Sequence, residues 1–167
     1  LDAATASRPD SVRLVEVLMG DPSSSDPACR AVPRGVACKS VGQLTYGTDF
    51  VTKAVGNNIA VIPLKPLKGA TTYILVLTND LRDTEGRSIA PSTTYELVKQ
   101  DLATLPLGSE AQRQLQGVIN SYENAVSTQS IAKETIIYTA AITTQSTTNV
   151  LSTVKQLMLP SPLNNNT

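Results

Sequence analysis

The strongest structural signal in the chain comes from residues 63–78, which read PLKPLKGATTYILVLT. Pro63 and Pro66 exclude an α-helix there, and the β-branched and aromatic residues from Thr71 onward favour a strand. Successive side chains of a strand point to opposite faces. One face would hold Tyr73, Leu75 and Leu77, and the other Ile74 and Val76. Because both faces are apolar, the pattern predicts a central strand that is covered on both sides.

Further strands are predicted on either side of this one. Residues 11–19 alternate in the manner of a mostly buried strand. Residues 44–53 and 59–62 are two short strand-like runs separated by the turn residues 55–58, which predicts a hairpin. Residues 134–143 are rich in β-branched side chains and form the last predicted strand.

Two helices are expected in the C-terminal part of the chain. Ser109 and Gln112 fit a capping box, with serine as the N-cap and glutamine three residues later. The apolar face of this helix would consist of Leu115, Val118, Ile119, Tyr122 and Val126. A second apolar stripe, ending at Pro160, consists of Val150, Leu151, Val154, Leu157 and Met158.

These elements predict an α+β chain. We expect a β domain over residues 1–100, with a cysteine-containing loop at 21–42. A helix-strand-helix extension of the same region, packed on that domain, is expected over residues 101–160. Residues 161–167 are expected to form a flexible tail.

The composition excludes several classes of function. The 167 residues carry no net charge, so the chain lacks the basic surface that nucleic-acid phosphates require. The sequence contains no histidine, and Ser-His or Cys-His nucleophile pairs and His-ligated metal sites all need an imidazole. No apolar stretch approaches the roughly 20 residues that span a bilayer. The chain starts at Leu1 rather than at methionine, and we expect it to be a piece of a longer precursor.

The two cysteines, Cys29 and Cys38, enclose a short loop that contains a proline and a glycine. A disulfide between them is geometrically plausible and would restrain a segment with few expected core contacts. The alternative is two unpaired thiols. With no histidine and no Cys-x-x-Cys motif, metal binding or redox catalysis is disfavoured, and a structural disulfide would indicate an oxidising compartment.

No catalytic, cofactor or metal site is predicted. Gly86-Arg87-Ser88-Ile89-Ala90 is the nearest approach to a nucleophile elbow, but it has alanine in place of the second glycine. Asp80, Asp83 and Glu85 lie in a predicted turn, but in a calcium-loop frame Leu81 would stand at the first ligand position. We interpret this cluster as a solvated acidic turn.

Charged residues are sparse towards the C-terminus. Residues 109–167 hold only six of them. Depletion of charge is typical of surfaces that contact another molecule, and it is equally compatible with a threonine-rich solvated face.

Two groups of motifs resemble known families. Pro63-Leu64-Lys65-Pro66-Leu67, Thr71-Thr72-Tyr73 and the segment from Leu81 to Ala90 resemble a bacterial Ig-like pattern. The helix around Ser121-Tyr122-Glu123, followed by Ile136 to Ser146 and Val150-Leu151, resembles the N-terminal region of bacterial virulence-factor lipases. Ile142 stands where an aromatic residue usually precedes the Thr-Thr-Gln-Ser sequence.

The resemblance implies a fold and a role. The fold would be an Ig-like, mainly antiparallel β-sandwich with the helix-strand-helix segment packed on it. The chain would be a non-catalytic N-terminal domain of a lipase that is extracellular or held at the outer-membrane surface of a Gram-negative bacterium. It would precede an α/β-hydrolase domain that supplies the serine, acid and histidine for lipid ester hydrolysis, and it would position that domain, shield its active site or contact lipid.

A second interpretation is a free-standing Ig-like adhesion or cell-surface spacer module that binds through loops such as 21–42. The two differ in one expected property. An adhesion module would expose no contiguous apolar patch around the C-terminal helices, whereas a domain separated from its partner would expose one.

Overall fold

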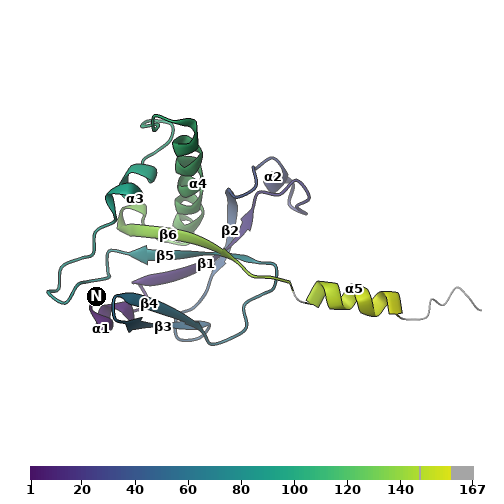
Figure 1. Cartoon of the computed structure of the whole chain (residues 1–167), viewed down its shortest axis with the longest axis horizontal. Helices are drawn as coiled ribbons and strands as arrows, with labels where there is room; N and C mark the ends of the chain where they lie inside the picture. The colour runs from purple at the N-terminus through teal and green to yellow at the C-terminus, as the bar shows by residue number, and fades with distance from the viewer. Residues whose placement is uncertain (147, 159–167) are drawn as a thin grey trace, which may run out of the picture.

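The computed structural model describes residues 1–146 and 148–158. Its centre is a four-stranded antiparallel sheet in the order β2-β1-β5-β6 (Figure 1). The strands are β1 (Val12–Met19), β2 (Ala37–Gln43), β5 (Thr72–Thr78) and β6 (Ile136–Thr143). A separate antiparallel hairpin is formed by β3 (Phe50–Val55) and β4 (Asn58–Pro63).

The helices are mostly short, and α4 is the longest of those described, with 18 residues. They are α1 (Ala3–Ala6), α2 (Pro27–Arg30), α3 (Thr93–Val98), α4 (Glu110–Ser127), the 3-10 turn η1 (Lys133–Thr135) and α5 (Thr148–Met158).

Strand β5 is a central strand covered on both faces, as the sequence predicted. It pairs with β1 on one side and with β6 on the other. Ile74 and Val76 pack towards the helices, whereas Leu75 and Leu77 pack towards the hairpin. The sheet is therefore the middle of three layers, with α3 and α4 above it and β3 and β4 below it in Figure 1.

The helical layer forms the largest core. Val15, Val17, Ile74 and Val76 of the sheet meet side chains of α3 and α4, including the fully buried Val126. The predicted capping box at Ser109 and Gln112 is present and starts α4.

The buried face of α4 differs from the predicted one. Ile119 and Val126 are buried as expected, but Leu115 is exposed, and Gln116 and Glu123 are buried in its place. Both polar side chains make hydrogen bonds that compensate for the loss of water.

The hairpin layer closes the other face of the sheet. Phe50 is buried against Val12 and Leu14, and the Tyr46 ring meets Phe50 edge to face at 5.5 Å between centroids. The hairpin confirms the prediction for this region, although its first strand begins at Phe50 rather than at Leu44.

The α+β class and the mainly antiparallel pairing are confirmed. The described residues show a four-stranded sheet with helices on one face and a two-stranded hairpin on the other, and no Ig-like sandwich of two full sheets is seen among them. The apolar residues of α3 and α4 cover the face opposite the hairpin. The ranges 1–100 and 101–160 share this sheet and this core, because β6 pairs with β5.

Residues 21–42 do not form one continuous loop. Residues from Ala37 onward belong to β2, which pairs with β1, and α2 lies within the connection. Strand β2 contains Lys39, Ser40 and Gly42 and lacks apolar periodicity, so its pairing was not visible in the sequence. Helix α3 was also missed, because it is only six residues long.

Helix α5 forms as predicted but does not pack on the domain. It extends away from the sheet beyond the end of β6 (Figure 1). Pro160, the predicted tail and the side chain of Val150 lie outside the described residues. Within the described ranges, no helix is long and apolar enough to cross a bilayer.

Candidate functional site

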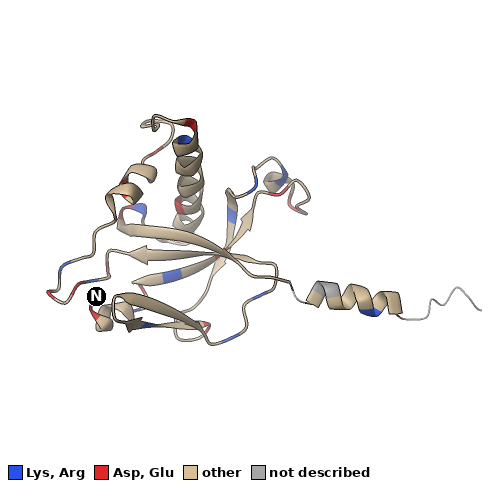
Figure 2. Cartoon of the chain, in the orientation of Figure 1, with Lys and Arg blue, Asp and Glu red and all other residues tan. Residues whose placement is uncertain are grey.

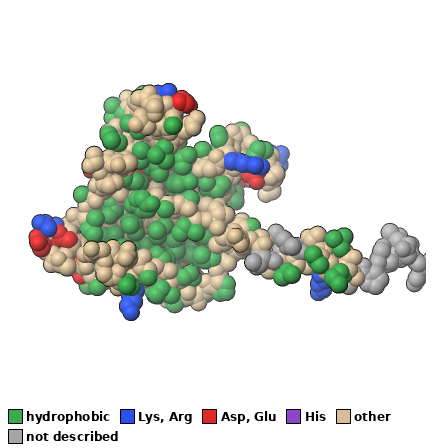
Figure 3. All heavy atoms as spheres, viewed as in Figure 1, with side chains coloured by type: hydrophobic (Ala, Val, Ile, Leu, Met, Phe, Trp, Pro, Cys, Tyr) green, Lys and Arg blue, Asp and Glu red, His purple; other side chains and the backbone are tan. Residues whose placement is uncertain are grey.

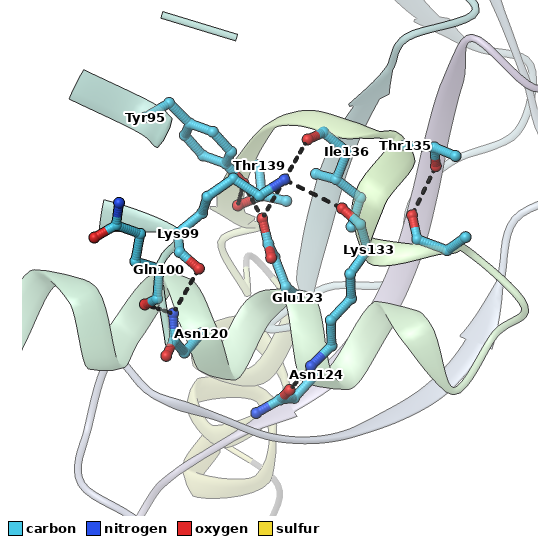
Figure 4. A network of polar contacts seen from close by, with 11 residues as sticks. Tyr95, Lys99, Gln100, Asn120, Glu123, Asn124, Lys133, Thr135, Ile136 and Thr139 are labelled. Atoms are coloured by element: carbon cyan, nitrogen blue, oxygen red, sulfur yellow. Dashed lines mark hydrogen bonds and ion pairs between the residues drawn. The ribbon is translucent and has the colours of Figure 1, made fainter. Parts of the chain in front are cut away.

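The most elaborate polar arrangement lies between the helical layer and the sheet (Figure 4). The Tyr95 hydroxyl of α3 donates a 2.9 Å hydrogen bond to Oε1 of Glu123 on α4. The same hydroxyl lies 3.0 Å from Oγ1 of Thr139 on β6. The Lys99 ammonium lies 3.7 Å from the Glu123 carboxylate. Three elements therefore meet around the hydrogen bond between Tyr95 and the buried carboxyl group of Glu123, and we call this group of side chains the Glu123 cluster.

Burial dominates the electrostatics of the Glu123 cluster. It raises the pKa of Glu123 above its ordinary value, and the Lys99 charge and the Tyr95 hydrogen bond oppose this only in part. Burial also raises the pKa of Tyr95 far above its ordinary value, so this hydroxyl stays protonated and remains a donor.

Lys99 extends the Glu123 cluster to the backbone. Its ammonium donates to the carbonyl oxygens of Ile136 at 2.7 Å and Lys133 at 3.1 Å. The Lys133 ammonium in turn donates to Oδ1 of Asn124, and the Asn120 amide donates to the carbonyl of Gln100 at 3.0 Å. These bonds tie α3, α4 and η1 to the start of β6.

A shallow hollow of about 320 Å³ opens beside the Glu123 cluster. Its lining consists of Lys99, Asp101, Asn120, Glu123, Asn124, Lys133 and Glu134. The central donors and acceptors are already bonded to one another, and the Tyr95 hydroxyl keeps its proton beside the Glu123 carboxylate because burial raises its pKa. We therefore assign the Glu123 cluster a structural role, as a clamp between helices and sheet.

The other sequence motifs are engaged in local structure. Ser88 is exposed and forms an isolated antiparallel bridge with Arg82. The Asp83 carboxylate accepts hydrogen bonds from the Arg87 guanidinium at 2.7 Å and from the Glu85 and Arg87 amides at 2.9 Å, which lowers the pKa of Asp83. Among the described residues, no group of Asp, Glu or Cys side chains could hold a metal ion.

Cys29 and Cys38 are joined in a disulfide, with their Cα atoms 5.4 Å apart. Cys29 is fully buried in α2, and Cys38 lies in β2. The bond therefore fixes the connection between β1 and β2 to the edge of the sheet.

Apolar side chains are exposed on strand β6 and helix α5. Tyr138 and Ile142 of β6 are 46% and 51% exposed, and on α5 Leu151 and Leu157 are 69% and 81% exposed. In Figure 3, hydrophobic side chains gather over the middle of the visible face, where β6 and the strands next to it lie. Figure 2 shows the charged residues mainly in the surrounding loops and helix ends, with none on β6. We call the exposed apolar residues of β6 and α5, namely Tyr138, Ile142, Leu151, Val154, Leu157 and Met158, the β6–α5 surface.

A comparison with known protein families identifies the family of the chain. The family model described as bacterial virulence factor lipase N-terminal matches residues 10–161. The chain belongs to this family. No curated protein and no solved structure gave a significant match.

Membership of the lipase N-terminal family confirms the resemblance noted in the sequence. The family name implies a lipase whose catalytic domain lies elsewhere. The chain has no histidine and so lacks part of a Ser-His-acid triad, as a non-catalytic N-terminal domain would. The disulfide together with the family suggests secretion.

The sequence predicted the apolar stripe of α5 but not its exposure, and it did not predict the Glu123 cluster. Glu123 stood next to Tyr122 on a predicted helix, where a glutamate is normally solvated. The one signal in the sequence was the position of Glu123, four residues after Ile119 and three before Val126, which places it on the apolar face of the predicted helix.

Proposed function

We propose that this chain is the non-catalytic domain that positions the catalytic α/β-hydrolase domain of a secreted or surface-anchored lipase. The parent enzyme would hydrolyse lipid esters outside a Gram-negative cell. The observation on which the proposal rests is the exposed apolar stripe of α5, formed by Leu151, Val154, Leu157 and Met158.

A partner surface would account for α5. The helix has 11 residues, and isolated helices of this length are marginal in water. The helix lies away from the three-layered body, its residues Leu151, Val154, Leu157 and Met158 are exposed, and Lys155 is its only charged residue. Burying one leucine side chain contributes about 1.5–3 kcal/mol of favourable free energy. Contact with a neighbouring domain would therefore stabilise the helix and hold the two domains together.

The division of chemistry supports the same role. Ester hydrolysis by a serine lipase needs a nucleophile, a histidine base and an acid that orients the base. This chain has no histidine to contribute, so its effect on the reaction would come through binding and orientation.

The test compares two double variants of the complete lipase. Leu151→Ser/Leu157→Ser removes apolar groups from the β6–α5 surface. Leu105→Ser/Leu115→Ser is the matched control, because both leucines are exposed outside that surface. Hydrolysis is measured on a soluble short-chain ester and on an aggregated long-chain ester.

The first variant should lower kcat/KM on both substrates by about tenfold, which corresponds to about 1.4 kcal/mol, and the control should leave it unchanged. Loss on the aggregated ester alone would show that α5 contacts lipid rather than positioning the catalytic domain. If the complete gene product hydrolysed no ester, the adhesion-module interpretation would replace the lipase role.

A further inference from the structure

The two edges of the main sheet differ in how they are protected. Edge strand β2 carries Lys39, has two register irregularities against β1 and is covered by α4. Ser121 of α4 accepts a 2.9 Å hydrogen bond from the Ala37 amide, and Thr128 lies 2.6 Å from the Ser40 hydroxyl. Bulges, charges and covering elements are the usual means by which proteins keep an edge strand from pairing with another chain.

Residues 140–143, the second half of edge strand β6, have almost none of this protection, whereas Ile136, Ile137 and Thr139 in its first half are buried. Residues 136–143 include no charged residue and no proline, and the only register irregularity against β5 lies at the start of the strand. In the described part of the chain, β6 pairs with β5 on one side, and no strand pairs with its other side. Figure 1 shows β6 as the last strand of the sheet.

The register identifies the free backbone groups. The Thr144 amide donates to the carbonyl of Thr71 at 3.0 Å, so Thr144 faces β5. In an antiparallel pair the backbone groups of alternate residues point to the same side. The N–H and C=O groups of Ala141 and Thr143, both exposed residues, therefore point away from β5, where an added strand would bond to them, whereas Thr139 is buried.

The side chains around this edge suit a strand from another part of the protein. Ala141 and Thr143 are small and exposed, and on the opposite face Tyr138 and Ile142 present apolar area. Because Lys99 bonds the Ile136 carbonyl, the charge-free part of the edge is the second half of the strand. A strand added along residues 140–143 would bury apolar area of Tyr138 and Ile142.

We infer that strand β6 receives an extended segment of the catalytic part of the same polypeptide as a fifth strand of this sheet. The inference rests on the proposed function and names the contact that would hold the two domains together. The chain leaves β6 directly towards α5, whose exposed apolar residues the proposed function assigns to the same partner domain, so a segment of that domain would be held near this edge. A segment of the same polypeptide binds intramolecularly, which favours it over a second copy of the chain.

Hydrogen–deuterium exchange of the complete lipase and of the 167-residue chain tests the inference. In the complete lipase, the amides of Ala141 and Thr143 should exchange about tenfold more slowly than in the shorter chain. The amides of Tyr138, Ala140 and Ile142, which face β5, should be protected in both and serve as internal controls. Equal exchange of the outer amides in the two proteins would overturn the inference.

Two substitutions at the centre of the edge sharpen the test. Ala141→Pro removes an outward amide without removing a bond to β5, and Ala141→Lys places a charge on the edge while keeping the amide. Both should abolish the extra protection of Thr143 in the complete lipase. Val41→Lys, at an exposed apolar position on strand β2, is the matched control and should leave that protection intact.

A further variant tests whether strand β6 instead pairs with strand β6 of a second copy of the chain. Ala141→Cys would form a disulfide-linked dimer if two β6 strands paired around Ala141, and such a dimer with concentration-dependent protection would overturn the inference. If protection is absent while Leu151→Ser/Leu157→Ser still lowers activity, the strand addition fails and the proposed function stands. If protection appears but that variant is fully active, the contact through α5 fails instead.

Discussion

The Tyr95 hydroxyl and the Glu123 carboxylate meet at 2.9 Å in a buried position, and this bond joins helix α3 to helix α4 above strand β6. The two residues are 28 positions apart in the sequence, and the whole loop between the helices lies between them. The bond is therefore a long-range contact of the helical layer, and several properties of the domain depend on it.

Tyr95→Phe should lower the free energy of unfolding by about 1–3 kcal/mol, because Glu123 and Thr139 both lose a buried partner. Urea unfolding followed by circular dichroism measures the change. Tyr122→Phe is the matched control, since its hydroxyl makes one 3.1 Å bond to the Gly35 carbonyl nearer the surface, and it should cost less than about 1 kcal/mol. Equal losses for the two variants would contradict the role of the Glu123 cluster.

The stability of the domain should depend on pH through Glu123. Burial raises the pKa of Glu123 in the folded state, so the folded protein binds this proton more tightly than the unfolded chain does. The contribution is complete below the ordinary pKa of 4.5 and is lost as the pH rises through the raised value. The free energy of unfolding of the wild type, relative to Glu123→Gln, should therefore fall as the pH increases.

Urea unfolding of both proteins between about pH 4 and pH 8 measures that difference, and the subtraction removes the titration of all other groups. A difference that stays constant, or that grows with pH, would show that the carboxyl is not desolvated.

Gly20→Ala should destabilise the domain by about 1–3 kcal/mol. A Cβ at this position would lie 2.3 Å from the Pro33 carbonyl oxygen and 2.4 Å from that of Val32, and backbone atoms cannot move aside as a side-chain end can. Gly42→Ala, on neighbouring strand β2, is the control, because no atom lies within 4 Å of its Cβ. Thermal unfolding should separate the two variants, and similar midpoints would mean that the 20–36 connection is loosely packed.

Reduction of the disulfide should lower the free energy of unfolding by about 2–3 kcal/mol, the value expected for a short loop. Urea unfolding with and without a phosphine reductant measures the effect. The variant Cys29→Ala/Cys38→Ala should be insensitive to the reductant. If the wild type were equally insensitive, the connection between β1 and β2 would be held by its other contacts alone.

The parts of the fold that the sequence predicted correctly depend on local patterns. The apolar alternation of 72–78 and the capping box at Ser109 are complete within a few residues, and both appear as expected. Strand β2 and helix α3 were missed because they gain their stability from partners distant in sequence, such as β1 and α4.

Of the β6–α5 surface, the sequence predicted the apolar stripe of α5 but not its exposure. The spacing of Leu151, Val154, Leu157 and Met158 defined an apolar stripe, but the same spacing fits a helix packed on the domain and a helix that faces another partner. The bare edge of β6 was not predictable at all, because it follows from the strand order β2-β1-β5-β6. The Glu123 cluster likewise depends on three elements whose meeting no local pattern encodes.

The pairing of β5 with β6 also sets the order in which the domain can be assembled. Strands β1, β2 and β5 are all complete by Thr78, but their last neighbour ends only at Thr143. When the chain emerges from the ribosome, or crosses a membrane from its N-terminus, Tyr73, Leu75 and Leu77 of β5 stay unpaired on the side of β6. They can pair only when residues up to 143 are available. The sheet therefore keeps an incomplete, apolar edge at β5 throughout this interval, and its four strands can close only after β6 has emerged.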